Sequence, residues 1–233
     1  MSKIAKPRDL DGYRSRPKRS YLLTSMDVLY TESMRQTCHP KLLPLLDSSS
    51  VLRTSDLAAL GLPRTVLAVP LAQGAISRIG RGIYSVTGHE VTEHHSLAQA
   101  AAHVPQGVIC LLSALVVHGM TTQSPHEVWM ALDGNTRRPV VGSPTLRIVR
   151  FGGPALTEGV ESRMIDGISV RLTTAAKTVA DCFKFRNKVG IAVAVEALRD
   201  GLAKRLFTLQ ELDLMAHVCR VHNVLKPYLE ALI

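Results

Sequence analysis

The chain has 233 residues, enough for one large domain or two modest ones, and its formal net charge of +9 favours a polyanionic partner. Aromatic residues make up only 4% of the chain, which argues against base-stacking platforms for single-stranded nucleic acid. No apolar run reaches the roughly 18 residues that a membrane-spanning helix needs, so we expect no membrane partner.

Residues 1–25 form a basic leader that we expect to be disordered. Three interpretations stay open: a solvated tail, an extension from an upstream start codon with Met26 or Met34 as alternative starts, and an arm that follows DNA phosphates. Residues 26–49 are expected to add a helix that packs on the elements after it. The charged residues of the leader are Lys3, Lys6, Arg8, Asp9, Asp11, Arg14, Arg16, Lys18 and Arg19.

The next segment is predicted to be two short helices joined by a glycine turn. Thr54 can cap the first helix through its hydroxyl, and Gly61 can end that helix by adopting a positive φ. Pro63 suits the first turn of the second helix, where its missing N–H is not needed. The apolar face of the second helix is expected to comprise Val66, Leu67 and Leu71. This order is typical of a helix-turn-helix.

A basic hairpin is predicted directly after the two helices. Ile76–Ser77 and Ile83–Val86 resemble strands, with Gly80-Arg81-Gly82 as a tight turn between them. Arg78 and Arg81 would then meet phosphates or enter a minor groove. Helix pairs with a glycine turn also occur in cores that bind nothing. The arginine-tipped hairpin favours a winged helix-turn-helix DNA-binding domain over residues 26–88.

A second domain, residues 94–233, is predicted to mix helices and strands. Helices are expected at 97–102, within the apolar run 108–118, after Thr173 or Thr174 through 185, at 189–202, from Thr208, and at 226–233. Strands are expected at 127–132 and 146–151, with a hairpin around Asp166-Gly167. Strands ringed by helices without regular alternation indicate an α+β fold: the winged helix followed by a mixed α+β domain.

Three further motifs accompany the helix-turn-helix: L-L-S-A-L-V-V-H-G-M-T-T (111–122), H-E-V-W-M-A-L (126–132) and T-A-A-K-T-V-A-D-C-F-K-F-R-N-K (174–188). Together they resemble the AbiEi-type antitoxin family, transcriptional regulators of the type IV AbiE toxin–antitoxin systems, over residues 50–233. The resemblance implies a winged helix that binds inverted repeats in the family's own promoter, followed by a C-terminal antitoxin domain. It also implies a nucleotidyltransferase toxin as functional partner, neutralised without a stable complex.

The resemblance also implies which side chains face double-stranded DNA. The positions carried over are Arg53, Thr54, Ser55, Arg64, Thr65, Arg78, Arg81 and Tyr84. Pro70 departs from the family pattern, because an interior proline breaks or kinks a helix. We therefore expect the recognition helix to be short or bent near 66–70, with base readout coming from its first turn, around Arg64 and Thr65.

No motif for catalysis, a cofactor or a metal stands out. The chain lacks a [DE]-x-K triplet, a P-loop, a G-x-S-x-G elbow and the nucleotidyltransferase pattern, so we expect no enzyme. His94, His95, His118 and His126 with Glu127 lack any metal-ligand spacing, and His118 is expected to end a helix before Gly119.

Several charged and sulfur-bearing residues receive structural interpretations. Lys177 and Asp181 are expected to form a solvated i,i+4 pair, with a role on an antitoxin surface as the alternative. The four cysteines are widely separated and are expected to be small buried hydrophobes in a reducing cytoplasm: Cys38, Cys110, Cys182 and Cys219. Four arginines either widen the basic surface or are scattered solvated charge: Arg137, Arg138, Arg147 and Arg150.

The sequence thus predicts a cytoplasmic DNA-binding repressor and antitoxin that meets inverted repeats as a monomer or weak dimer. Two alternatives stay open. One is a protein-interaction module that binds a toxin without reading DNA. The other is an enzyme, such as an orphan nuclease or a nucleotide-binding regulator. The operator and the oligomeric state do not follow from the sequence.

Overall fold

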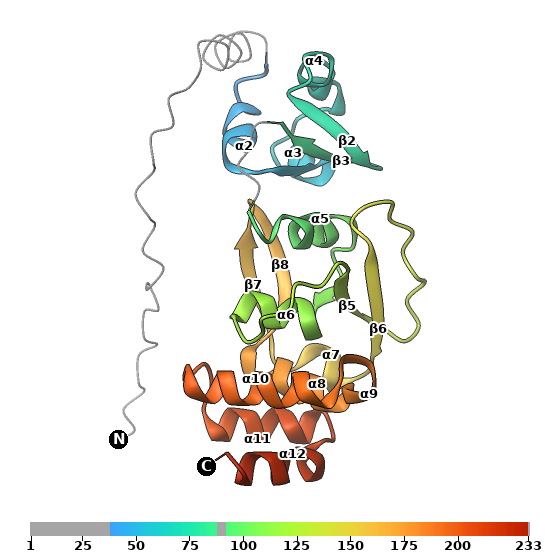
Figure 1. Ribbon diagram of the computed structural model, residues 1–233. Coiled ribbons are helices and arrows are strands. Elements are labelled where there is room, and N and C mark those ends of the chain that lie inside the picture. Colours follow the sequence, from blue (N-terminus) through green and yellow to red (C-terminus); the bar gives the residue numbers. More distant parts are fainter. Residues whose placement is uncertain (1–37, 88–91, 233) are drawn as a thin grey trace, which may run out of the picture. The chain divides into compact units, whose positions relative to one another are not determined.

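The computed structural model describes residues 38–87 and 92–232, and it shows a mixed α+β chain with two sheets (Figure 1). The basic leader and most of the helix expected over 26–49 lie outside the described residues. We refer to residues 38–87 as the N-terminal module and to residues 92–232 as the C-terminal module. No helix in these two ranges is long and apolar enough to cross a bilayer.

The N-terminal module contains an antiparallel three-stranded sheet in the order β1-β3-β2. Its strands are β1 (Val51–Arg53), β2 (Ile76–Gly80) and β3 (Ile83–Val86). Its helices are α2 (Leu43–Ser48), α3 (Thr54–Ala59), the 3₁₀ helix η1 (Arg64–Leu67) and α4 (Ala68–Ala72). The two helical segments, the glycine turn and the hairpin therefore follow in the order that the sequence predicts.

The second helical segment is not one straight helix, which agrees with the interruption expected from Pro70. A 3₁₀ turn covers Arg64–Leu67 and an α-helix begins at Ala68, so Pro70 lies in the first turn of α4, where no N–H is needed. The apolar face expected for this segment is wrong at Leu71, which is 37% exposed, while Pro70 is buried. A 3₁₀ turn has three residues per turn, which shifts the residues after it around the axis.

The C-terminal module is built on a five-stranded sheet in the order β6-β5-β4-β8-β7. The pairs β5–β6 and β4–β8 are parallel, and β4–β5 and β7–β8 are antiparallel. The strands are β4 (Val108–Ile109), β5 (Val128–Asp133), β6 (Leu146–Phe151), β7 (Val160–Ile165) and β8 (Ile168–Thr173).

Helices cover both faces of this sheet. Because side chains alternate along a strand, Met130 and Leu132 of β5 pack with helix α5 (His95–His103), while Trp129 and Ala131 join the core around helix α8 (Ala175–Lys184). The helices are α5 (His95–His103), α6 (Leu111–His118), α7 (Pro154–Thr157), α8 (Ala175–Lys184), α9 (Arg186–Val189), α10 (Ile191–Ala203), α11 (Leu209–Val218) and α12 (His222–Glu230). The last three follow one another at the C-terminal end of the chain (Figure 1).

Most expected elements of this module are confirmed, and the differences are local. The apolar run 108–118 divides into β4 and α6, and Cys110 between them has an extended backbone. The hairpin turn has φ of 49° at Asp166 and 77° at Gly167, as two-residue turns of this sequence require. Thr174, not Thr173, caps α8 by accepting from the Lys177 N–H. The final helix begins at His222, four residues before the expected start.

The expectation that Lys177 and Asp181 are solvated is wrong, because both side chains are 0% exposed. The Lys177 Nζ lies 2.6 Å from each carboxylate oxygen of Asp181 and 4.8 Å from the centroid of the Phe151 ring. The Cys219 thiol donates to Asp181 Oδ1 at 3.2 Å. Helix α8 packs against α6, α10 and α11, so the face of α8 that carries this pair does not meet solvent.

Burial sets the protonation of the groups around this pair. It raises the pKa of the Asp181 carboxyl above its ordinary value, and the Lys177 ammonium opposes that rise. Burial, together with the negative charge of Asp181, raises the pKa of the Cys219 thiol to about 12. That thiol therefore stays protonated and acts as a donor. None of the four cysteines forms a disulfide within the described ranges, and all four are buried, as expected from the sequence.

Removing one partner of the buried pair should destabilise the protein strongly. Lys177→Met leaves an uncompensated carboxylate in the core and should lower the free energy of unfolding by about 3–5 kcal/mol in urea denaturation. The matched control is Lys226→Met, which removes an exposed i,i+4 pair with Glu230 and should cost less than about 1 kcal/mol. Similar losses for the two variants would show that the core tolerates an isolated Asp181.

Candidate nucleic-acid interface

The start of α3 presents three of the eight candidate residues. Helix α3 begins at Thr54, and Arg53 occupies the N-cap position, so the expectation that Thr54 caps this helix is wrong by one residue. The Asp56 carboxylate takes over the capping role, because its Oδ2 accepts from the Arg53 backbone N–H at 2.9 Å. Asp56 also pairs with the Arg53 guanidinium at 3.4 Å and accepts from the exposed Ser55 hydroxyl at 3.3 Å. Arg53 is thus held in one orientation beside Ser55.

The hairpin turn lies against the same end of α3. The Thr54 N–H donates to the Gly82 carbonyl at 2.9 Å, and Arg53 pairs with Ile83 in the β1–β3 ladder. Gly82 has a φ of +73°, and a Cβ there would lie 2.7 Å from Thr54 Oγ1. This close approach needs glycine and brings the turn that carries Arg81 to the start of α3.

Two further candidate residues are neighbours on the strands of the hairpin. Arg78 on β2 lies directly opposite Tyr84 on β3, so these two candidate residues are cross-strand neighbours. Tyr84 is half-buried, whereas Arg78 is exposed and donates from Nε to the Gly80 carbonyl at 3.2 Å. The pair places a cation and a phenol on one face of the hairpin.

Arg64 and Thr65 occupy a separate exposed position at the start of η1. Gly61, with a φ of +69°, ends the turn after α3, and Pro63 enters η1 with an extended backbone. Both Arg64 and Thr65 are exposed, and no hydrogen bond or ion pair within the described ranges joins their side chains to the other six candidates. The structure therefore places three candidates beside the turn that carries Arg81, pairs two more across the hairpin, and leaves these two apart.

Three guanidinium groups of the N-terminal module form no ion pair with a carboxylate of the described residues. Arg64, Arg78 and Arg81 are exposed, and none of the ion pairs between described residues includes them. Residues 38–87 contain only two acidic residues, Asp47 and Asp56, and the second is engaged by Arg53. Free arginines of this kind suit phosphate oxygens, which guanidinium groups bind in a bidentate manner.

The rear of the hairpin is anchored to the C-terminal module. Ile79 and Ile83 pack with Val51 and Leu97 in one core cluster, and Gly80 lies against the His103 ring at the end of α5. Burial lowers the pKa of His103, so its ring is neutral at pH 7. The strands of the hairpin are therefore fixed from behind, while Arg81 at the tip stays exposed.

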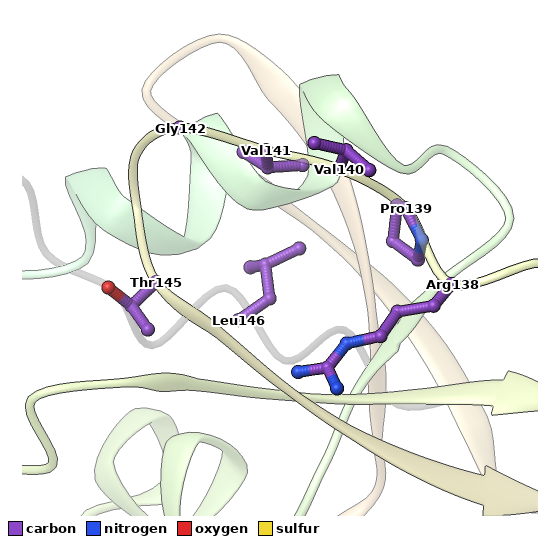
Figure 2. Close-up of a pocket in the computed structure, with 7 residues that line it drawn as sticks. All are labelled: Arg138, Pro139, Val140, Val141, Gly142, Thr145 and Leu146. Atoms are coloured by element: carbon purple, nitrogen blue, oxygen red, sulfur yellow. The ribbon is translucent and has the colours of Figure 1, made fainter.

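Three arginines of the C-terminal module that were considered from the sequence differ in their contacts. Arg147 pairs with Glu127 at 3.3 Å and lies over the Trp129 ring, and Arg150 donates to the Asp133 carbonyl at 2.7 Å. These contacts favour a structural role for both. Arg138, by contrast, extends under the loop between β5 and β6 (Figure 2).

The cavity beneath that loop has a volume of about 360 Å³. Figure 2 shows Arg138 and Leu146 projecting into the arch of the loop, with Thr145 at its other end. Its polar side chains are one guanidinium and one hydroxyl, so it lacks the paired acid and base that a hydrolytic site would need. The full lining is Arg138, Pro139, Val140, Val141, Gly142, Thr145 and Leu146.

Two of the histidines considered from the sequence, His118 and His95, make structural contacts. His118 ends α6 before Gly119, as expected, and its Nε2 donates to the Thr173 carbonyl at 2.7 Å. His95 Nδ1 lies 2.8 Å from Asp166 Oδ2. Sequence reasoning missed a different group, which joins α11 to α12: Asp213, His217 and His222. The i,i+4 spacing of its first two members was the available signal.

Residues 40–87 match the model of a family described as transcriptional regulator, AbiEi antitoxin. The match runs from before α2 to the end of β3 and includes all eight candidate residues. The resemblance predicted from the sequence is thereby confirmed for this segment, which spans well under half of the 233 residues. No curated protein matches the chain.

The contact between the hairpin turn and α3 predicts a strong effect of Gly82→Ala. An added methyl group must occupy a left-handed conformation and clash with Thr54, so the free energy of unfolding should fall by about 1–2 kcal/mol or more. Gly134→Ala is the control, because nothing lies within 4 Å of a Cβ there, and it should change stability by less than about 0.5 kcal/mol. Equal values in denaturant titrations would contradict the close packing of the turn.

Proposed function

We propose that this chain is a DNA-binding repressor and antitoxin of a toxin–antitoxin operon, because residues 40–87 match the model of the AbiEi antitoxin family of transcriptional regulators. The observation that carries the proposal is a set of exposed guanidinium groups on the helical turn and the hairpin that pair with no carboxylate within residues 38–87 and 92–232: Arg64, Arg78 and Arg81. We propose the division 1–25 for a basic leader, 26–88 for a winged helix-turn-helix, and 94–233 for the antitoxin domain.

In this mechanism, η1 is the part of the recognition helix that reads bases. The change from 3₁₀ to α geometry at Ala68 shortens the regular helix, so Arg64 and Thr65 at its start reach furthest into the major groove. An arginine can bind the O6 and N7 atoms of guanine together, which gives sequence preference.

The hairpin and the start of α3 bind the backbone. Arg78 and Arg81 contact phosphates or the minor groove, and the hydroxyls of Thr54, Ser55 and Tyr84 add hydrogen bonds to phosphate oxygens. Asp56 orients Arg53 so that it lies beside these hydroxyls. Such contacts release counterions and make binding sensitive to salt. Inverted repeats are met by a weak dimer or by two monomers that bind cooperatively.

The C-terminal module is proposed to neutralise a nucleotidyltransferase toxin in the cytoplasm without catalysis of its own. The Lys177–Asp181 pair is itself unsuited to catalysis, because both groups are 0% exposed and satisfied by each other. A general acid or base must reach its substrate, and this pair does not.

Replacing Arg64 and Arg81 should have different effects on DNA binding. Arg64→Ala should weaken binding to DNA from upstream of the chain's own gene by about 1–3 kcal/mol more than binding to random DNA of equal length. Arg81→Ala should weaken both alike and reduce the slope of log K against log salt by about 1. Fluorescence anisotropy over a salt series measures both.

Arg199→Ala on α10 is the matched control, since it removes an exposed arginine far along the chain and should leave both affinities unchanged. Equal losses for Arg64→Ala on the two DNAs would refute base readout. Absence of any salt-dependent binding by the unaltered chain would favour the alternative, a module that only binds a protein toxin.

The antitoxin role predicts rescue of growth. Co-expression of the chain with a nucleotidyltransferase encoded beside it should restore growth of cells that the enzyme arrests. The double variant Arg64→Ala/Arg81→Ala should rescue equally well, because the two functions reside in different modules. Rescue that is lost with DNA binding would show that repression alone accounts for protection.

A further inference from the structure

We propose that Asp213, His217 and His222 form a zinc site at the junction of α11 and α12. Asp213 and His217 are separated by one helical turn on α11, and His222 is the first residue of α12. His222 Nδ1 lies 2.8 Å from Asp213 Oδ1, and His217 Nε2 lies 3.7 Å from the same oxygen. One ligand atom from each residue falls within 4.8 Å of the others.

The donor set indicates the metal. Two imidazole nitrogens and one carboxylate oxygen form a common three-ligand set for Zn²⁺, whereas Mg²⁺ and Ca²⁺ prefer oxygen ligands alone. Tetrahedral zinc with bonds of about 2.0–2.1 Å keeps its ligand atoms roughly 3.3 Å apart. The two separations in the structure, 2.8 and 3.7 Å, lie on either side of this value. Zinc would replace the proton between Asp213 and His222.

The backbone of the site is already in place. The turn between the helices is closed by hydrogen bonds from Val221 N–H to the Ala216 carbonyl at 2.8 Å and from Arg220 N–H to the His217 carbonyl at 3.0 Å. Arg220 adopts a φ of 58° at the position where glycine usually ends a helix. Little backbone entropy is therefore lost when a metal binds.

Only the side chains need to adjust. The rings of His217 and His222 are stacked, with centroids 4.4 Å apart and planes 17° from parallel. One ring must rotate so that both nitrogen lone pairs point at the ion. Both side chains are free to do so, since they are 61% and 37% exposed.

Some charges around the site attract a cation, and others repel it. The Asp213 carboxylate and the C-terminal end of α11, where His217 lies, attract a cation. Lys184 and Arg220 oppose it, and they line a cavity of about 460 Å³ together with His217. Three protein ligands leave the fourth position of a tetrahedral ion open to solvent or to a small anion.

Zinc bound here would link α11 to α12 and stabilise both. The test uses the full chain without a histidine tag. Zinc titration should raise the melting temperature, and Co²⁺ should give the visible absorption of a four-coordinate ion with nitrogen and oxygen ligands. Mg²⁺ should produce neither effect.

Asp213→Asn, His217→Gln and His222→Gln should each weaken zinc binding by roughly tenfold or more and abolish the thermal shift. His126→Gln is the control, because it removes an exposed histidine elsewhere and should leave zinc binding unchanged. The proposal is overturned if the unaltered chain binds no zinc, or if binding persists at full strength in the three variants. Circular dichroism of the metal-free variants separates a ligand effect from a folding effect.

Discussion

A lysine and an aspartate enclosed together in α8 impose the main constraint on the C-terminal module. Lys177 and Asp181 satisfy each other within α8, and the Phe151 ring of the sheet and the Cys219 thiol after α11 complete their surroundings. A rotation of α8 about its axis would carry the pair away from these partners, and a slip of α11 along α8 would remove the thiol donor. A buried ion pair is costly unless its remaining hydrogen-bonding positions are also satisfied. The pair thus selects one packing of the helices among several that apolar side chains alone would allow.

The N-terminal module meets a different constraint, which is to keep a small basic surface in a fixed shape. Asp56 holds Arg53, Thr54 holds the Gly82 carbonyl, and Gly80 lies on His103. Arg64, Arg78 and Arg81 are attached to this fixed backbone, and none of them pairs with a carboxylate in the part of the chain that the structure describes. A rigid backbone with free side chains lowers the entropy lost on binding without neutralising the charge that attracts the ligand.

Local signals in the sequence were sufficient for most elements and insufficient for burial. The Asp166-Gly167 turn, the cap at Thr208 and the interruption near Pro70 follow from one or a few residues each, and all are confirmed. The Lys177–Asp181 pair could not be predicted as buried, because i,i+4 spacing is the same on a surface helix and depends on which helices pack around it. For the same reason, the eight candidate DNA contacts could be named from the sequence, but their grouping into three places needed the strand register and the turn at Gly82.

The burial of the four cysteine thiols has a practical consequence. All four thiols are buried, and burial raises the pKa values of Cys110, Cys182 and Cys219, so the reactive thiolate is scarce while the chain is folded. Alkylating reagents and peroxide should therefore react slowly with the cysteines of the folded protein and modify them mainly when the core opens. Under the proposed function, regulation would then not depend on cysteine oxidation, and the rate of maleimide labelling would report how often the core opens.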